Sequence, residues 1–220
     1  MAKKTEAGRA SISFKAQAKK KLSGAPSEPA PTPRMKTHYY EYVVPKLKEQ
    51  FGYTSIMQVP RITKIVVSMG VGDAHENPRK LNTFLDEIEL VTGQRPQVTR
   101  ARVSVANFKL REGMAVGLRV TLRKARMYEF LDRLLALVIP RLRDFRGLSP
   151  KSFDRRGNYN FGLPDQLAFP ELRADTVDFQ NGMNLAVATT ARTDDEAREL
   201  LRLMGFPFKN HPVQLIGVEG

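Results

Sequence analysis

An alternating segment inside a strongly basic stretch constrains the fold more than any other part of the sequence. Apolar residues occupy every second position over residues 116–122, and the polar positions beside them hold Arg119, Thr121 and Arg123. A period of two predicts a β-strand with one face packed on a core and the other left open. The surrounding stretch, 95–126, holds nine Lys or Arg residues and one acid. A solvated surface would normally mix both signs, so this strand predicts contact with a phosphate backbone.

A second strand and a loop extend this basic surface. Residues 65–69 alternate in the same way, which places Lys64 and Ser68 on the open side of their strand. Residues 104–114 form a basic loop before the first strand, and Phe108 in this loop would either pack on the core or lie against an exposed base. The polar, aromatic and basic residues of this loop that we single out are Asn107, Phe108, Lys109 and Arg111.

Apolar residues at helical spacing predict several amphipathic helices. Pro45 must start or kink the first of them, and Pro140 should stop the third. The last one opens with a capping box formed by Thr193 and Glu196. Residues 141–165 are expected to form loops. The apolar stripes run over residues 40–51, 81–91, 127–138 and 197–204.

Helices and strands alternate along the chain, but at least one pair of strands is hairpin-like. The predicted fold class is α+β: an antiparallel sheet with helices packed on one face and an open basic face, plus a projecting basic loop. Residues 1–34 hold eight basic residues and two acids and end in a Pro/Ala/Ser-rich run, which predicts a disordered basic N-terminal arm. A transit peptide is the alternative for this arm. The globular domain is expected over 35–210, followed by a C-terminal tail over 211–220.

Composition limits the chemistry of the 220-residue chain. A net charge of +13 favours a polyanionic partner, and nucleic acid fits this charge better than an anionic membrane. The absence of cysteine excludes disulfides and thiol catalysis, and three distant histidines do not suggest a metal site. No run of 18 apolar residues exists, so no membrane span is expected.

The sequence also offers a weak alternative, a nucleotide-dependent enzyme using the Gly70–Asp73 turn. The turn follows a strand, as a dinucleotide-binding loop does, but the third glycine of that motif is missing. Asp86, Glu87 and Glu89 are explained by a solvated helix face. No catalytic arrangement of side chains stands out, so we expect no active site and no cofactor.

Several long runs resemble a known family. They occur in matching order at 57–65, 69–74, 92–96, 104–114, 117–123, 140–148, 152–162 and 205–208. Over residues 35–210 the chain resembles the bacterial form of large-ribosomal-subunit protein five, the 5S ribosomal RNA-binding family. The resemblance implies a structural role in the central protuberance of a cytoplasmic ribosome, without catalysis.

The resemblance also implies the RNA contacts. Family positions that touch 5S ribosomal RNA match Ser68, Gln94 and Thr121, and a hydroxyl at Ser68 replaces the asparagine that most relatives carry. With their basic neighbours, the expected 5S-binding residues are Lys64, Ser68, Gln94, Arg119, Thr121 and Arg123.

Two further surfaces follow from the resemblance. The loop with Asn107, Phe108, Lys109 and Arg111 should reach the elbow of P-site transfer RNA. Segments near 141–147 and 158–165 should face a protein of the small-subunit head and form an intersubunit bridge. The bridge residues are expected to be Arg141, Arg143, Arg146 and Asn158. Other large-subunit RNA and neighbouring large-subunit proteins complete the expected partners.

Overall fold

Five strands form one antiparallel sheet in the order β2–β3–β1–β5–β4. The structure is a computed structural model that describes residues 31–72, 77–143, 145–172, 177 and 179–209. The arm expected over 1–34 and the tail over 211–220 therefore lie almost entirely outside the described residues. Sheet and helices together confirm the α+β class. The strands are β1 (Ile62–Gly70), β2 (Gln97–Arg100), β3 (Ala115–Leu122), β4 (Tyr159–Leu163) and β5 (Met183–Thr189).

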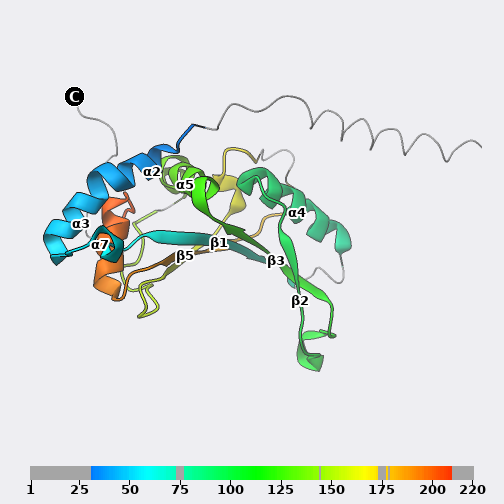
Figure 1. Ribbon diagram of the computed structural model, residues 1–220. Helices are drawn as coiled ribbons and strands as arrows, with labels where there is room; N and C mark the ends of the chain where they lie inside the picture. Colours follow the sequence, from blue (N-terminus) through cyan, green and yellow to red (C-terminus); the bar gives the residue numbers. More distant parts are fainter. Residues whose placement is uncertain (1–30, 73–76, 144, 173–176, 178, 210–220) are drawn as a thin grey trace, which may run out of the picture. The chain divides into compact units, whose positions relative to one another are not determined.

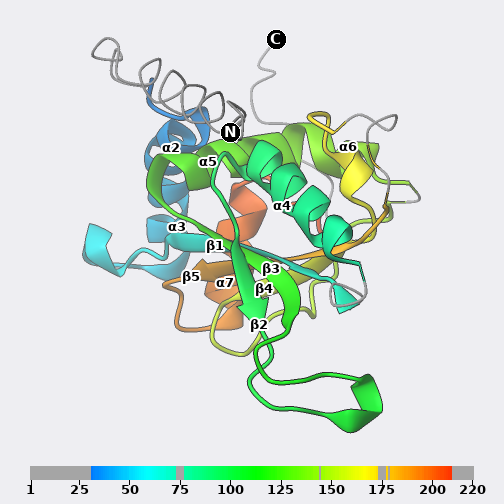
Figure 2. The same ribbon diagram turned by 90° about the vertical axis from the view of Figure 1, so that its right-hand side faces the viewer.

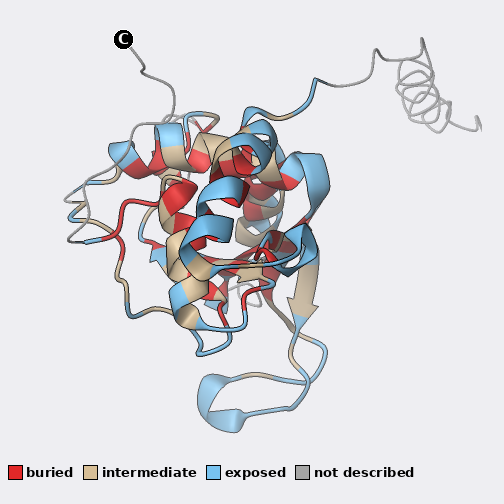
Figure 3. Cartoon of the chain, turned by 60° about the vertical axis from the view of Figure 1, so that its left-hand side comes forward, coloured by how far each residue is buried: buried red, intermediate tan, exposed pale blue. Residues whose placement is uncertain are grey.

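Strand register separates an apolar face from an open face. On β3, Leu118, Val120 and Leu122 are buried while Arg119 is exposed, as the alternation predicted. These apolar residues lie opposite alternate residues of β1, and β5 continues the same apolar rows. Figure 3 shows the buried residues gathered between the sheet and the helices. The hydrophobic core therefore lies on one side of the sheet, and Arg119 lies on the other.

Helices cover the apolar face, as Figures 1 and 2 show. Helix α2 (Arg34–His38) lies beside helix α5 (Lys124–Arg133), and Arg34 Nη2 and Asp132 Oδ1 form an ion pair at 2.6 Å between them. Arg34, assigned to the arm from the sequence, is the first residue of α2. Within the described residues, no helix is both long and apolar enough to cross a bilayer. The helices are α2 (Arg34–His38), α3 (Val44–Phe51), α4 (Pro78–Thr92), α5 (Lys124–Arg133), α6 (Ile139–Arg141) and α7 (Asp194–Leu203).

The two helices that continue past an internal proline each include a π-helical turn, whereas the proline of α4 stands at its first residue. The turn η2 (Tyr39–Val43) precedes Pro45, and the turn η6 (Leu134–Val138) precedes Pro140. Proline has no N–H, and its ring clashes with the carbonyl four residues earlier, so a wider turn before it lets the helix continue. The first helix therefore runs through Pro45 from α2 to α3, and the other ends at Arg141, near Pro140 as expected.

The π turn also changes which tyrosine is buried. We expected Tyr40 on the core face, but its side chain is 57% exposed and Tyr39 is buried instead. A π turn takes more residues than a turn of α-helix, so a constant α-helical spacing assigns residues near it to the wrong face. The hydroxyl of Tyr39 donates to the carbonyl oxygen of Pro60 at 3.0 Å.

Helix α4 buries the apolar stripe that the sequence predicted, and it also buries one acidic residue that was expected in solvent. Phe84, Ile88 and Val91 are buried, and Gly93 ends the helix with a φ of 65°. The solvated face expected for Glu87 is wrong, because this residue is buried and accepts a 2.9 Å hydrogen bond from Nε2 of Gln166. A buried carboxyl group requires such partners, and this one comes from a distant part of the chain.

Strand β4 corrects the loop expected over 141–165. Tyr159 and Leu163 are buried on the apolar side, and Phe161 lies opposite Leu185 of β5. Tyr159 is fully buried, and burial raises the pKa of its hydroxyl group to about 12. Its ring packs near Phe153, Phe161, Phe206 and Phe208. This aromatic cluster fixes the β4 edge of the sheet against the segment that follows α7.

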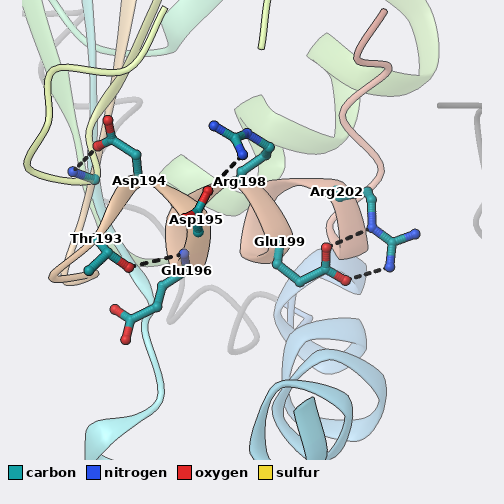
Figure 4. Close-up of polar contacts among 8 residues, drawn as sticks. Thr193, Asp194, Asp195, Glu196, Arg198, Glu199 and Arg202 are labelled. Atoms are coloured by element: carbon teal, nitrogen blue, oxygen red, sulfur yellow. Dashed lines mark hydrogen bonds and ion pairs between the residues drawn. The ribbon is translucent and has the colours of Figure 1, made fainter. Parts of the chain in front are cut away.

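Helix α7 begins with the predicted cap, shown in Figure 4. Thr193 Oγ1 accepts from the backbone N–H of Glu196 at 3.4 Å, and the Glu196 carboxylate accepts from the N–H of Arg192 at 2.9 Å. Asp194 does more than complement the helix dipole, because its Oδ1 accepts from the N–H of Gly157 at 3.0 Å. The start of α7 is thereby tied to the turn before β4.

Candidate functional site

The open face of the sheet contains a broad hollow of about 650 Å³, which we call the open hollow. Its floor is made of small side chains from β1 and β5, namely Val66, Ala186 and Ala188, and its polar groups stand around them. Lys64 and Arg119 contribute positive charge and Asp154 contributes one carboxylate. The remaining lining is mostly hydroxyl and amide groups: Thr63, Ser68, Asn158, Asn160 and Thr189.

Strand register brings four predicted residues to this face. Ser68 of β1 lies directly opposite Arg119 of β3, and Lys64 lies four residues earlier on the same face of β1. Thr121 lies opposite Val66, one row further along. Residues directly opposite on neighbouring strands have Cβ atoms about 5 Å apart, so one ligand can contact several of them at once.

Two predicted residues lie at the ends of secondary-structure elements. Arg123 is exposed and directly precedes α5. Gln94 follows Gly93 in the connection between α4 and β2, where its backbone N–H and carbonyl both bond to the hydroxyl of Thr92. Neither residue lines the open hollow.

Sequence reasoning missed two amides on the open face. Asn184 of β5 is exposed and lies opposite Ser68, on the side away from Arg119. Asn160 of β4 lies opposite Ala186 and lines the open hollow. The alternation of β5 could have indicated Asn184. Asn160 was missed because β4 itself was not predicted.

The β2–β3 connection, 101–114, extends beyond the sheet as a largely exposed loop (Figures 1 and 3). Its tip is closed by two backbone hydrogen bonds between Val105 and Leu110, of 2.9 and 3.1 Å. Phe108 is 72% exposed, so of the two alternatives for this ring the core-packed one is wrong. Lys109 has a φ of 52°, and Asn107 and Arg111 beside it are exposed.

A second hollow, of about 450 Å³, lies over the segment that follows α6, and we call it the lateral hollow. Arg143, Arg146 and Lys209 contribute positive charge to its lining. Arg141 is exposed but does not line it. Asn158 lines the open hollow instead, so the structure groups this residue with Ser68 rather than with the arginines proposed for the bridge.

Candidate sites for other chemistry do not appear in the described part of the chain. No group of three or more histidine, aspartate or glutamate side chains is placed to hold a metal ion there. Gly70 ends β1, and Asp73 of the alternative nucleotide-binding turn lies outside the described residues. The open hollow, in contrast, presents hydroxyls, amides and two cations, which are groups suited to binding sugar and phosphate.

The sequence is similar to known proteins over most of its length. A family model described as ribosomal protein L5 matches residues 55–111, and a second model, which describes the C-terminus of the same ribosomal family, matches residues 115–208. The chain is similar to large ribosomal subunit protein uL5 of Thermobifida fusca, with 55% identity over 179 residues, or 81% of this chain and 94% of the relative. For uL5 of Gloeothece citriformis the identity is 55% over 178 residues, covering 81% and 99%. For uL5 of Rubrobacter xylanophilus it is 57% over 176 residues, covering 80% and 98%.

Proposed function

Because the chain belongs to the ribosomal protein L5 family, we propose that its open sheet face binds 5S ribosomal RNA. The protein is a structural constituent of the large ribosomal subunit rather than an enzyme. The nucleotide-dependent enzyme considered for the Gly70–Asp73 turn is set aside with this assignment. The bacterial relatives favour a cytoplasmic ribosome. The basic arm expected over 1–34 stays a prediction, apart from Arg34, which belongs to α2.

The open hollow is the main structural feature that supports RNA binding to this face. Its small floor residues leave room for a sugar–phosphate backbone, and Lys64 and Arg119 reach it from two neighbouring strands. RNA helices are recognised mostly through shape, phosphates and 2′-hydroxyls, which hydroxyl and amide groups can meet as donors and acceptors. Ser68 supplies one such hydroxyl at the centre of the face.

Bound RNA gives a direct test of this function. The full-length protein should be purified without nuclease from cells that make ribosomes, and the RNA that remains bound should be identified by length and sequence. Recovery of 5S ribosomal RNA in a one-to-one ratio is the expected result. Stoichiometric nucleotide without RNA would contradict the proposal and return the enzyme alternative.

We assign the contact with P-site transfer RNA to the β2–β3 loop. The loop tip presents an exposed ring, Phe108, beside the cations Lys109 and Arg111. An aromatic side chain can stack on an unpaired base while neighbouring cations meet phosphates, which suits a folded RNA elbow. No residue of this tip is among those that line the open hollow.

We assign the intersubunit bridge to the lateral hollow and its neighbourhood. Arg141, Arg143 and Arg146 are all exposed there, whereas Leu142 and Phe145 between them pack against the core. This alternation presents three cations on one surface, which suits an acidic patch on a small-subunit head protein.

Subunit association tests the bridge. Arg143→Gln with Arg146→Gln should weaken association of the two subunits about fivefold, since exposed ion pairs each contribute roughly 0.2–1 kcal/mol. Light scattering at several magnesium concentrations measures the change. Lys48→Gln with Arg79→Gln removes two exposed cations from the helices and serves as the control. Equal effects of the two variants would rule out a specific bridge at this surface.

A further inference from the structure

The turn that precedes β4 is held together from within by one carboxylate. Oδ1 of Asp154 accepts from the backbone N–H of Arg156 at 2.9 Å and from that of Asn158 at 3.0 Å. Oδ2 of the same group accepts from Nδ2 of Asn158 at 2.7 Å. We call residues 154–158 the arginine turn, because Arg155 and Arg156 lie in it.

Contacts from β5 and α7 fix the arginine turn from outside. The hydroxyl of Thr189 donates to the carbonyl of Gly157 at 2.6 Å, and the N–H of Gly157 donates to Asp194 at 3.0 Å (Figure 4). Gly157 has a φ of 73°, and a Cβ at this position would lie 2.9 Å from that of Ala191. The turn therefore lies close against the rest of the protein and has little freedom to move.

Arg155 occupies a backbone conformation that its side chain disfavours. Its φ is 64°, in the left-handed region that glycine adopts readily and that costs other residues about 1 kcal/mol. Arg155 and Arg156 are exposed, and in the described part of the chain neither forms an ion pair. Two guanidinium groups are thus displayed on a rigid support, and no ion pair among the described residues neutralises them.

The position of the turn indicates a target. Asp154 and Asn158, which flank the arginines, both line the open hollow together with Lys64, Ser68 and Arg119. The arginines therefore stand at the rim of this hollow, at the β4–β5 side of the sheet, whereas Arg119 stands on β3. They are not among the residues that line the lateral hollow.

We propose that the arginine turn is a preorganised phosphate clamp, in which Arg155 and Arg156 hold the backbone of the RNA that lies on the open face. The proposal rests on the function assigned to that face and adds a second anchoring point across the sheet from Arg119. The planar guanidinium group binds phosphate oxygens in a fork, and a support fixed before binding reduces the ordering that binding requires. An acidic protein would be the competing partner for the same charges.

Stability and RNA affinity should respond in opposite ways to one variant. Arg155→Gly combined with Arg156→Gln should keep the protein as stable or more stable in urea denaturation, because glycine relieves the backbone at position 155. Its affinity for 5S ribosomal RNA in filter binding should nevertheless fall about tenfold at moderate salt. The slope of log affinity against log salt should decrease by roughly 1.5, since each lost phosphate contact removes about 0.7–0.9. Lys48→Gln with Arg79→Gln is the charge-matched control.

Two variants of Asp154 test the preorganisation. Asp154→Asn and Asp154→Ala remove the same charge, but only asparagine keeps an oxygen that accepts from the N–H groups of Arg156 and Asn158. Asp154→Ala should therefore bind 5S RNA about threefold more weakly than Asp154→Asn, with an equal salt slope. Equal affinity of the two would show that the shape of the turn does not matter.

The remaining outcomes separate this proposal from the function of the face. If the Arg155/Arg156 variant binds 5S RNA like the control while Arg119→Ala weakens binding, the clamp is overturned and the function stands. If neither weakens binding, the open face is not the RNA site and both proposals fail. Normal 5S affinity together with loss of a ribosomal protein from assembled subunits would assign the turn to a protein partner and also overturn the clamp.

Discussion

Gly117→Ala should lower the free energy of unfolding by about 3 kcal/mol, at the upper end of what overpacking usually costs. Gly117 lies in β3, between the neighbouring strands β1 and β2. A Cβ at this position would lie 2.6 Å from the carbonyl oxygen of Met69 in β1 and 3.3 Å from Oγ1 of Thr99 in β2. A backbone oxygen cannot swing aside as a flexible side chain can. The strands would have to separate, so hydrogen bonds between β1 and β3 would be lost. Urea denaturation followed by circular dichroism measures the change.

Gly70→Ala is the matched control. Gly70 lies directly opposite Gly117 in the register of β1 and β3, yet a Cβ on Gly70 would meet no atom within 4 Å. This variant should keep its stability or gain up to about 0.5 kcal/mol, because alanine restricts the unfolded chain. Equal losses at both positions would mean that the close approach of β1 and β3 is not what requires Gly117.

Replacing residues 107–111 with a Gly/Ser linker should weaken retention of P-site transfer RNA about tenfold while leaving 5S binding and subunit assembly unchanged. Stacking of a base on an aromatic ring contributes roughly 1–3 kcal/mol, and the cations add a salt-dependent share. The strand pairs that end at Arg100 and Ala115 lie outside the replaced segment, so the sheet should persist. Dissociation of labelled transfer RNA from the P site measures the effect.

Two smaller variants divide the contribution of this loop. Phe108→Ala removes the ring and keeps the charges, so its effect should depend little on salt. Lys109→Gln with Arg111→Gln removes the charges and keeps the ring, so its effect should shrink as salt rises. The assignment to transfer RNA would be wrong if the linker variant kept its fold but lost 5S RNA in filter binding.

Short-range sequence patterns correctly predicted the elements in which buried residues recur at one constant spacing. The alternation of β3 identified both the buried row with Leu118 and the open row with Arg119, because a half-buried strand repeats every two residues. The capping box of Thr193 and Glu196 is similarly local. The open-face position of Ser68 followed from the alternation of β1 in the same way.

The structural features that the sequence did not predict correctly have identifiable physical causes. Tyr40 was assigned to the core because a helical spacing does not reveal a π turn. Glu87 was assigned to solvent because its partner, Gln166, lies 79 residues away in sequence. Strand β4 is short and contains Asn160 and Gly162, which are uncommon in strands, so its alternation was overlooked. The arginine turn could not be found either, since a positive φ at Arg155 leaves no mark in the sequence.

Binding of 5S ribosomal RNA to the open face can be tested with a variant that combines Arg119→Ala and Thr121→Ala, by measuring its affinity for that RNA. Arg79→Ala with Thr83→Ala makes the same chemical change on α4, on the helical side of the sheet, and is the control. A lost hydroxyl contact of about 1 kcal/mol and a lost charged contact of similar or larger size should together reduce affinity by roughly 30-fold. Filter binding should show this loss for the sheet variant and little change for the helix variant. Unchanged affinity of the sheet variant, with its fold intact, would place the RNA on another surface and rule out the open face as its binding site.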